Sequence, residues 1–595
     1  MKNKRKLLAR LMAYLVIFTA LPIYGMEIIE AQAEEFDYAV IPYGDAEKSD
    51  YTVSPYGDGV EITKYTGNDR NLVIPSRIGG KKVIRIGEDA FSECSRIVRV
   101  ELPEGLTSIG NSAFAECSSL GSLKLPNSVT SIGNFVFIGC SNLTSIEFSD
   151  SMTDIGRYAF SGCHKLTGMR LPSNMVNIGE NAFSGCTSLA DVEIPKSVAS
   201  IGGNAFWGCS GLESIRVAEG NAVYDSRGNC NAIVETQSNC LISGCKNTKI
   251  PESITSIGTD AFRGCSGLTS VELPNGVASI EYGAFLNCGG LIHMQLPDGI
   301  TKIGNDAFAG CTALADMEIP SSVVSIGYLG NVFRGCSSLE SLKVAEGNAV
   351  YDSRENCNAI IETKSNRLIV GCKNTKIPDS VTNIGEGAFS DCNAVANLKI
   401  PSGVSFIGNN AFYGCSGLTA LELPGSVMSI GYNAFYGCSN LADIKVAEGN
   451  KRYDSRKNCN ALIETKSNCL ILGCKNTKIP NGVTSIGQGA FSGCSGLIGI
   501  ELPSSVTEIG YQAFDSCSGL ENLKVAEGNA VYDSRENCNA IVETKGNHLI
   551  LGCKNTKIPN SVTGIGSEAF KGCIELTDIE VPNSITTIEG DAFLG

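Results

Sequence analysis

Cysteine is the side chain with the most chemistry to offer in this chain, which contains 26 of them. Six recur at a period of 23 residues, and these are Cys94, Cys117, Cys140, Cys163, Cys186 and Cys209. Equivalent positions in stacked coils lie about 4.8 Å apart, which suits the Cα atoms of a disulfide, but parallel Cβ vectors hold the sulfurs too far apart. We therefore predict a ladder of buried free thiols, with disulfides as the alternative that an exported protein suggests. No C-x-x-C pair with a nearby His completes a tetrahedral set, so no metal or other cofactor is expected.

Charged residues at one position of the repeat are the first candidate ligand contacts. Between two core aliphatics the chain carries, in turn, Glu101, Lys124, Glu147, Arg170, Glu193 and Arg216. Opposite charges side by side would stabilise the stacking register, so a structural charge ladder is the simplest interpretation. The alternation breaks where basic residues follow one another: Arg216 then Lys249; Lys343 then Lys376 and Lys399; Lys445 then Lys478; and Lys524 then Lys557. Because like neighbours cost stability, we predict that these residues contact an anionic partner, with solvated lysines as the alternative.

A four-residue motif, Tyr-Asp-Ser-Arg, supplies the second set of candidates. It begins at Tyr224, Tyr351, Tyr453 and Tyr532. Tyrosine and arginine are favoured anchors at interfaces, which makes these tyrosines candidate ligand contacts. Asp-Ser is also ordinary turn chemistry, so the alternative, which we favour, is that the motif fastens a local structure. The residues after Asp352 lack the spacing and glycine of a calcium loop.

No signature of catalysis is found in the sequence. It has no G-x-S-x-G, no H-E-x-x-H and no phosphate-binding loop. Its three histidines, His164, His293 and His548, lie in distant repeats. The position of His548 is held by Cys240, Arg367 or Cys469 in the equivalent copies, and a catalytic site would not exchange its residue so freely. We predict that the protein is not an enzyme.

An internal repeat must position all of these side chains. Its unit reads L-x-x-[IV]-x-[IL]-P-x-x-V-x-x-I-G-x-x-A-F-x-G-C, and its Ala-Phe or Val-Phe signature occurs in seventeen copies from Phe91 to Phe593. In the copy at 268–290, apolar and polar residues alternate before Pro274, which predicts a half-buried strand that the proline ends. A tighter turn and a short helical or 3-10 return that buries Phe285 should follow.

A longer unit interrupts the short one at 218–250, 345–377, 447–479 and 526–558. Its core text is A-E-G-N-x-x-Y-D-S-R-x-N-C-N-A-[IL]-[IV]-E-T, and it continues to G-C-K-N-T-K-I-P. Two apolar runs, at 359–363 and 368–369, flank a polar stretch and predict a β-hairpin. We expect each long unit to place a hairpin where the short units place a helical turn.

The ends of the chain differ from the repeats. Basic residues before position 11, the apolar run Leu11 to Ile23 and the small residues of Ala31-Gln32-Ala33 predict a signal peptide over 1–33, with a membrane anchor as the alternative. Residues 34–70 lack the period and are expected to cap the first coil, so that 71–595 form the solenoid. The chain stops at Gly595 inside a repeat, which leaves an apolar face for another chain or a longer sequence to cover.

Length and charge limit the class of protein. A chain of 595 residues exceeds a single compact core, so a repeat array or several domains are required. The formal net charge of −15 argues against a nucleic-acid partner, which would call for a basic stripe. No segment after the signal peptide is apolar enough to span a membrane.

The repeats resemble those of the BspA-type leucine-rich repeat proteins, a family of bacterial surface proteins. The short unit is similar to the family's 23-residue repeat, and Tyr351 to Thr363 resembles its longer variant. The resemblance covers roughly residues 58–595 and implies a curved solenoid outside the cell that takes part in adhesion. We expect a right-handed leucine-rich-repeat-type solenoid, with a parallel sheet on one face and short helical or 3-10 turns and hairpins on the other.

The leading functional hypothesis is a secreted or cell-surface protein that binds extracellular proteins of host matrix, mucosa or microbial surfaces. Near-identity of the long units favours a second hypothesis, a structural spacer or surface-coat protein without a specific ligand. A third is the recognition array of a longer multidomain protein. The sequence has no sorting motif or wall-binding module that would fix the mode of attachment.

Overall fold

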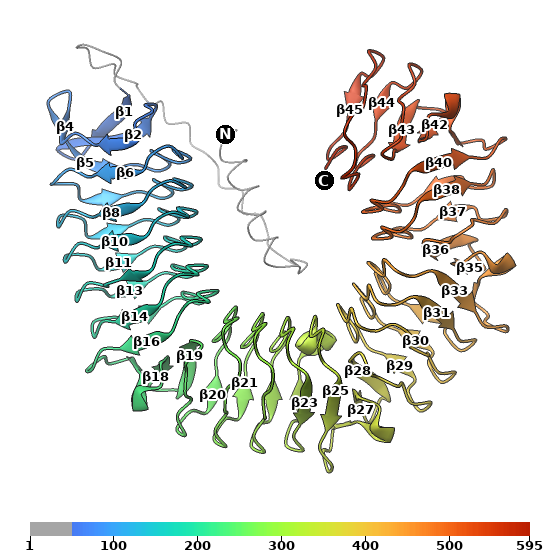
Figure 1. Cartoon of the computed structure of the whole chain (residues 1–595), viewed down its shortest axis with the longest axis horizontal. Coiled ribbons are helices and arrows are strands. Elements are labelled where there is room, and N and C mark those ends of the chain that lie inside the picture. Colours follow the sequence, from blue (N-terminus) through green and yellow to red (C-terminus); the bar gives the residue numbers. More distant parts are fainter. Residues whose placement is uncertain (1–49, 595) are drawn as a thin grey trace. The chain divides into compact units, whose positions relative to one another are not determined.

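The protein is a parallel β-solenoid of stacked coils (Figure 1). The structure is a computed structural model, and it describes residues 50–594. Most short coils contribute two strands, and each strand pairs in parallel with the equivalent strand of the next coil, as Ser145 does with Ser122, 23 positions away. The predicted class of fold is confirmed. The predicted signal peptide and the segment 34–49 lie outside the described residues.

The first strand of a coil lies just before the position that proline occupies in most repeats, and we call these the pre-proline strands. Their residues alternate between exposed and buried, as in Ser145–Glu147, where Ile146 alone is buried. Seven form one sheet: β3 (Asn71–Val73), β6 (Arg99–Glu101), β8 (Ser122–Lys124), β10 (Ser145–Glu147), β12 (Gly168–Met169), β14 (Asp191–Ile194) and β16 (Ser214–Val217). The others form pairs: β23 (Asp316–Ile319) with β25 (Ser341–Val344), β31 (Ala420–Leu423) with β33 (Asp443–Val446), and β38 (Gly499–Leu502) with β40 (Asn522–Val525).

The second strand of a short coil is a two-residue pair that ends in isoleucine, most often Ser-Ile and usually followed by glycine, and we call these the short strands. We expected a turn here, but two residues suffice for a ladder when an identical pair lies in the next coil. The first group is β7 (Ser108–Ile109), β9 (Ser131–Ile132), β11 (Asp154–Ile155), β13 (Asn177–Ile178) and β15 (Ser200–Ile201). The second is β20 (Ser256–Ile257), β21 (Ser279–Ile280), β22 (Lys302–Ile303) and β24 (Ser325–Ile326). The last three groups are β29 (Asn383–Ile384), β30 (Phe406–Ile407) and β32 (Ser429–Ile430); β37 (Ser485–Ile486) and β39 (Glu508–Ile509); and β44 (Gly564–Ile565) and β45 (Thr587–Ile588).

The segment that carries the Ala-Phe signature returns the chain, and we call it the Phe turn. It is a series of hydrogen-bonded turns rather than the expected short helix, because two of its residues adopt positive φ, such as Asn181 at 54° and Gly185 at 71°. The 3-10 helix η2 (Tyr328–Phe333) forms where one Phe turn is two residues longer. Phenylalanines of neighbouring turns stack face to face, as Phe285 does on Phe308 at 5.5 Å between ring centroids.

Each long unit contains the predicted hairpin, preceded by a two-residue strand and a 3-10 turn. The first comprises β17 (Tyr224–Asp225), η1 (Arg227–Asn229), β18 (Ala232–Glu235) and β19 (Cys240–Gly244). The second comprises β26 (Tyr351–Asp352), η3 (Arg354–Asn356), β27 (Ala359–Glu362) and β28 (Arg367–Gly371). The third comprises β34 (Tyr453–Asp454), η4 (Arg456–Asn458), β35 (Ala461–Glu464) and β36 (Cys469–Gly473). The fourth comprises β41 (Tyr532–Asp533), η5 (Arg535–Asn537), β42 (Ile541–Glu543) and β43 (His548–Leu551).

The hairpins lie between coils and divide the apolar core into five clusters. In β18, Ile233 packs into the core before the hairpin, whereas Ala232 and Val234 pack into the core after it. The second strand of the hairpin takes the place of a short strand, since Leu241 of β19 pairs with Ile257. Each hairpin therefore begins a new sheet of short strands, and the sheet of pre-proline strands stops before the long unit.

Long units lack a Phe turn, so the Phe turns on either side of each one meet directly. We call these four places junctions and number them along the chain. At the first junction the amide of Gly208 donates to the carbonyl of Arg263 at 3.2 Å. At the second, Gly335 donates to Ser390 at 3.4 Å. A long unit therefore adds backbone on the strand side of the stack and none at the tip of the Phe turns.

A hairpin of β1 (Tyr51–Tyr56) and β2 (Gly59–Tyr65) begins the described chain, and β2 pairs in parallel with β5 (Lys81–Ile86), which also pairs with β4 (Arg77–Ile78). Tyr65 and Phe91 pack at 5.2 Å between ring centroids, so this hairpin covers the first Phe turn. Among residues 50–594, no helix is long and apolar enough to cross a membrane.

Candidate binding surface

A shallow groove of about 1570 Å³ runs over the seven-stranded sheet of pre-proline strands. Its floor is made of the outward side chains of β6, β8, β10, β14 and β16, and of Arg170 after β12. Because side chains alternate along a strand, the residue between two buried aliphatics must point out of the sheet. The groove therefore presents the whole predicted charge ladder from Glu101 to Arg216.

The ladder has the predicted register. Lys124 lies opposite Glu147, and their Nζ and Oε2 atoms are 3.1 Å apart. Both side chains are more than two-thirds exposed, so this ion pair contributes little free energy, on the order of 0.5 kcal/mol. These pairs favour the register in which neighbouring strands stack, and they add little to the stability of the fold. Their exposed charges remain available to a partner.

The basic residue before each long unit occupies the same place in all four copies. Each lies on the last pre-proline strand of its sheet and is exposed there. Each is also paired in register with a glutamate of the preceding strand: Glu193 with Arg216, Glu318 with Lys343, Glu422 with Lys445, and Glu501 with Lys524. Of these four pairs, Glu501 and Lys524 make an ion pair at 3.2 Å, whereas Lys445 pairs with Asp443 of its own strand at 2.6 Å.

The basic residue within each long unit follows the hairpin of that unit. Lys249, Lys376, Lys478 and Lys557 are exposed and belong to no strand. Their amides donate to the cysteine carbonyls of the same long unit, as Lys376 does to Cys357 at 3.0 Å, which fixes the backbone and leaves the side chains to solvent. Among residues 50–594, the side chains of these four lysines and of Lys399 make no ion pair.

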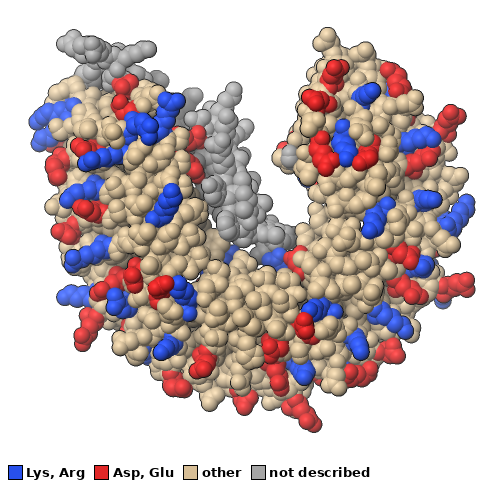
Figure 2. All heavy atoms as spheres, in the orientation of Figure 1, with Lys and Arg blue, Asp and Glu red and all other residues tan. Residues whose placement is uncertain are grey.

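Figure 2 shows acidic and basic side chains interspersed over the visible face, with no large area of one sign. The basic sets are therefore local features within an acidic chain, each bounded by glutamates. Such an arrangement suits a broad contact in which the acidic groups of a partner bind at separate positions along the surface.

The four motif tyrosines lie inside the solenoid. Tyr224, Tyr351, Tyr453 and Tyr532 are all less than a tenth exposed. The Tyr224 hydroxyl accepts a hydrogen bond from the amide of Ile201 at 3.2 Å, and Tyr351 does the same for Ile326. Each of these two hydroxyl groups thus pairs with a backbone amide of the last short strand before the hairpin. Ligand contact by these tyrosines stays a prediction, and their burial favours the structural alternative.

The rest of the motif fastens the hairpin. Arg227 binds Asp225 through two nitrogens, at 2.9 and 2.8 Å, and donates to Oδ1 of Asn239 in the hairpin turn at 2.7 Å. Ser226 accepts from the amide of Val217 and donates to the carbonyl of Ala232, at 2.9 and 2.7 Å. The second and fourth copies repeat all of these bonds, and the third repeats all but the one from the serine hydroxyl to the alanine carbonyl, so folding alone accounts for the motif.

One asparagine with a structural role was not singled out from the sequence. In the second long unit, Nδ2 of Asn348 donates to the carbonyls of Pro320 and Val323 in the preceding coil, at 3.0 and 2.9 Å. Its Oδ1 accepts from the amides of Val350 and Tyr351, at 2.9 and 2.8 Å. Asn221, Asn450 and Asn529 do the same in their copies. The recurrence of A-E-G-N was the available signal.

The thiol ladder predicted for the core is present. In many short coils Sγ lies near the carbonyl of the phenylalanine 26 residues before it, as in Cys140 with Phe114 at 3.2 Å. Burial raises the pKa of Cys209 and of Cys311 to about 12, so these thiols stay protonated and unreactive near neutral pH. Within residues 50–594, no group of three or more His, Cys, Asp or Glu side chains is placed to hold a metal ion.

Together, the stacked coils and the charged groove define a repeat protein built to present a surface. The chain belongs to the BspA-type leucine-rich repeat family. The family model for the BspA type leucine rich repeat region matches six times, over residues 65–189, 107–228, 238–359, 366–469, 463–541 and 549–595.

Several solved structures are similar to this chain. A leucine rich cell surface protein from Faecalibacterium prausnitzii A2-165 is 26% identical, with a TM-score of 0.39, over 68% of this chain and 94% of its own. A leucine-rich repeat protein from Bacteroides ovatus ATCC 8483 is 24% identical, with a TM-score of 0.35, over 81% and 100%. The pneumococcal vaccine antigen PcpA is 22% identical, with a TM-score of 0.44, over 65% and 98%. No curated protein matches.

Proposed function

We propose that this protein is secreted or displayed at a cell surface and binds extracellular proteins of host or microbial surfaces through its pre-proline strand face. The observation that carries the proposal is the placement of the basic residues: each set is exposed beside a long unit, and among residues 50–594 the side chains of Lys249, Lys376, Lys399, Lys478 and Lys557 make no ion pair. An acidic partner would supply the missing opposite charge. A family of surface proteins supports the location, and the groove supports a broad contact.

The near-identity of the long units no longer favours a spacer. The shared residues of the motif bind their own hairpin, so folding alone accounts for their repetition. Outward positions of the short units do vary, as His293, Gln295 and Lys399 show, whereas the basic residues beside the long units recur in all four copies.

The test is a binding screen of purified residues 34–595 against immobilised matrix and mucosal proteins at two salt concentrations. We expect saturable binding to an acidic partner that weakens with salt, because screening acts on exposed charges. The paired substitutions Lys376→Glu and Lys399→Glu should weaken that binding at least tenfold.

A matched control makes the same change of charge elsewhere. Lys364 and Lys466 are exposed in the turns of two hairpins, away from the pre-proline strands. Lys364→Glu with Lys466→Glu should leave binding unchanged. Equal loss in both double variants would show a general charge effect and remove the strand face as the site. A folded sample that binds nothing in the screen would leave the spacer as the better account.

A further inference from the structure

The fourth junction brings an amine and a carboxyl group into contact between two coils that a long unit separates in the sequence. Asp515 lies in the Phe turn before that long unit, and Lys571 lies in the Phe turn after it. The two backbones pack closely, since a Cβ added to Gly572 would lie 3.1 Å from Cα of Ser516. Nζ of Lys571 is 3.2 Å from Oδ1 of Asp515. The junction therefore holds a nucleophilic group against a carboxyl group.

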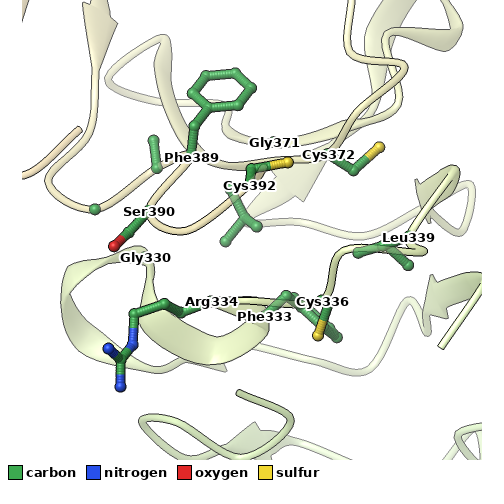
Figure 3. A pocket seen from close by; sticks show the side chains of 13 residues that line it. Gly330, Phe333, Arg334, Cys336, Leu339, Gly371, Cys372, Phe389, Ser390 and Cys392 are labelled. Carbon is green, nitrogen blue, oxygen red and sulfur yellow. The ribbon is translucent and has the colours of Figure 1, made fainter. Parts of the chain in front are cut away.

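The other three junctions carry different side chains at this position, which directly follows the phenylalanine of the signature. The residues there, before and after each junction, are Trp207 and Arg263, Arg334 and Ser390, and Tyr436 and Ser492. Figure 3 shows the second of these pairs, with Arg334 and Ser390 on facing segments. Arg334 binds the carboxylate of Asp391 at 3.4 Å, but a guanidinium stays protonated and is a poor nucleophile. Of the four junctions within residues 50–594, the fourth alone pairs an amine with a carboxyl group at this position.

A second carboxylate lies beside the amine. Oε1 of Glu568 is 3.3 Å from Nζ of Lys571. The side chains of Asp515, Glu568 and Lys571 are 7%, 16% and 21% exposed, so bulk water has little access to them. Oδ2 of Asp515 accepts hydrogen bonds from the hydroxyls of Tyr436 at 3.3 Å and Ser492 at 3.5 Å. One oxygen of this carboxyl group therefore faces the amine, and the other faces hydroxyl donors.

The groups around Lys571 decide where its protons lie. Burial by itself lowers the pKa of Lys571, whereas the hydrogen bonds and charges of Asp515 and Glu568 raise this pKa overall. The amine is therefore protonated in the resting pair, and two protons must leave the nitrogen before an amide can form. Glu568 is within reach to carry them. An amine and a carboxylate that are free in water do not condense, but contact within one fold supplies effective molarities on the order of 10⁵–10⁸ M.

We propose that Lys571 and Asp515 condense to an isopeptide bond, which joins the two Phe turns that meet at the fourth junction. One proton passes from Nζ to Oε1 of Glu568, and the neutral amine attacks Cγ of Asp515. Negative charge develops on Oδ2, where Tyr436 and Ser492 donate hydrogen bonds. Glu568 delivers its proton to Oδ1 and then carries a second one from the nitrogen to the same oxygen. The bond between Cγ and Oδ1 breaks, and Oδ1 leaves as water. An ammonium and a carboxylate thus become a neutral amide and one water, with no oxidant or reductant.

Mass spectrometry of the purified full chain, reduced and denatured, tests the proposal. We expect the intact mass to be lower by one water molecule than the mass calculated from the sequence and the observed N-terminus. Trypsin should not cleave after Lys571, and the peptide 479–524 should be recovered joined to 558–595. The cleavage sites that bound these peptides are Lys478, Lys524 and Lys557. A full calculated mass after days of incubation of the folded protein would overturn the proposal.

The chain contains a matched control. Nζ of Lys554 lies 2.9 Å from Glu521 and 2.7 Å from Glu575, but these two side chains are 40% and 62% exposed. Because water surrounds them, this group should stay unlinked and trypsin should cleave after Lys554. Linkage at Lys554 to the same extent would show that proximity alone causes the reaction, and it would overturn the assignment of a dedicated site to the fourth junction.

Two variants separate the reacting amine from the group that moves its protons. Lys571→Arg keeps a positive charge beside Asp515 but cannot form the bond, so it should have its full calculated mass. Glu568→Gln should lower the linked fraction at least tenfold, because an amide cannot carry the protons. Loss of water in Lys571→Arg would overturn the assignment of the bond, and an undiminished linked fraction in Glu568→Gln would overturn the role of Glu568. The measurement on the unaltered chain decides the proposal even where a variant does not fold.

Discussion

At the scale of single residues, the thiols have the largest consequence for how the protein responds to its surroundings. All but four of the 26 cysteines are buried, and the partly exposed ones are Cys94, Cys240, Cys469 and Cys573. Burial raises the pKa of the core thiols, as at Cys117, Cys209 and Cys311, because a thiolate loses its hydration in the core. The same burial links folding to pH.

We expect the free energy of unfolding to fall steeply in alkali. Unfolded thiols ionise near their ordinary pKa of 9.0, whereas Cys209 and Cys311 stay protonated until about 12. Between these values the unfolded state binds fewer protons, so each buried thiol costs about 1.4 kcal/mol of stability per pH unit, and below pH 9 its contribution is fully retained. Thermal unfolding at pH 7, 8, 9 and 10 measures this.

Replacing Cys209 and Cys311 together by alanine should make that alkaline slope shallower, which separates thiols from other titrating groups. Equal slopes in the two proteins would contradict the assignment. In addition, a thiol reagent at pH 8 should react rapidly with no more than the four partly exposed cysteines.

Replacing the asparagine of the A-E-G-N segment should loosen the contact between one long unit and the coil before it. Asn348→Ala removes two bonds to the preceding coil and two within its own turn. We expect a loss of about 1–3 kcal/mol, seen as faster amide exchange over residues 341–372. Asn348→Asp keeps only the acceptor and should give an intermediate effect. Unchanged exchange in both variants would remove the role.

The thiol ladder and the charge ladder could be predicted from the sequence because both depend on a period alone. Burial of Tyr224 and its equivalents could not be. A tyrosine near a turn is equally compatible with an interface and with a core, and only the position of the preceding coil decides between them. The contact between Gly208 and Arg263 was beyond prediction for a related reason, since residues 55 positions apart meet there only if the long unit is skipped.

At the scale of elements, the Phe turn carries most of the core. Phe285 is fully buried between Phe262 and Phe308, at 5.0 and 5.5 Å. Phe593 has one stacking partner, Phe570, and is 40% exposed. The two positions are a matched pair with the same local sequence.

We expect Phe285→Ala to cost about 3–5 kcal/mol, because it removes a fully buried ring and leaves a cavity. Phe593→Ala should cost about 1 kcal/mol, because much of that ring is already in water. Urea unfolding monitored by amide exchange at residues near each site measures the difference. Equal costs would show that stacking along the column, rather than burial, sets the contribution of each ring.

The hairpins were predictable because alternating apolar runs around a polar stretch are a local signal. The short strands were not, since two residues show no alternation. The absence of helix in the Phe turns also escaped prediction, because positive φ at residues such as Asn181 and Gly185 follows from contact with the next coil.

At the scale of the whole described chain, the core is five clusters separated by hairpins. Because coils contact only their neighbours, stability is a sum of local terms rather than one cooperative quantity. We expect the protein to unfold in blocks whose boundaries fall at the hairpins. The block after the fourth hairpin is the smallest, and it should open first.

Native-state amide exchange in increasing urea tests this expectation. Protection should be lost first after residue 553, and the first cluster, ending near Cys245, should persist longest because it is the largest. Simultaneous loss of protection along residues 50–594 would show that the hairpins couple the clusters instead of separating them.

The missing Phe turn of the long units has a consequence for how such chains can diverge. Duplication of a short unit inserts one layer everywhere, so it changes only the distance between two surface features. Duplication of a long unit inserts a layer on one side alone, and the hydrogen bond that joins Gly208 to Arg263 shows how the other side closes over it. The order of short and long units along the chain would therefore set both the spacing and the direction of the features on the surface. Neither change would require a new core.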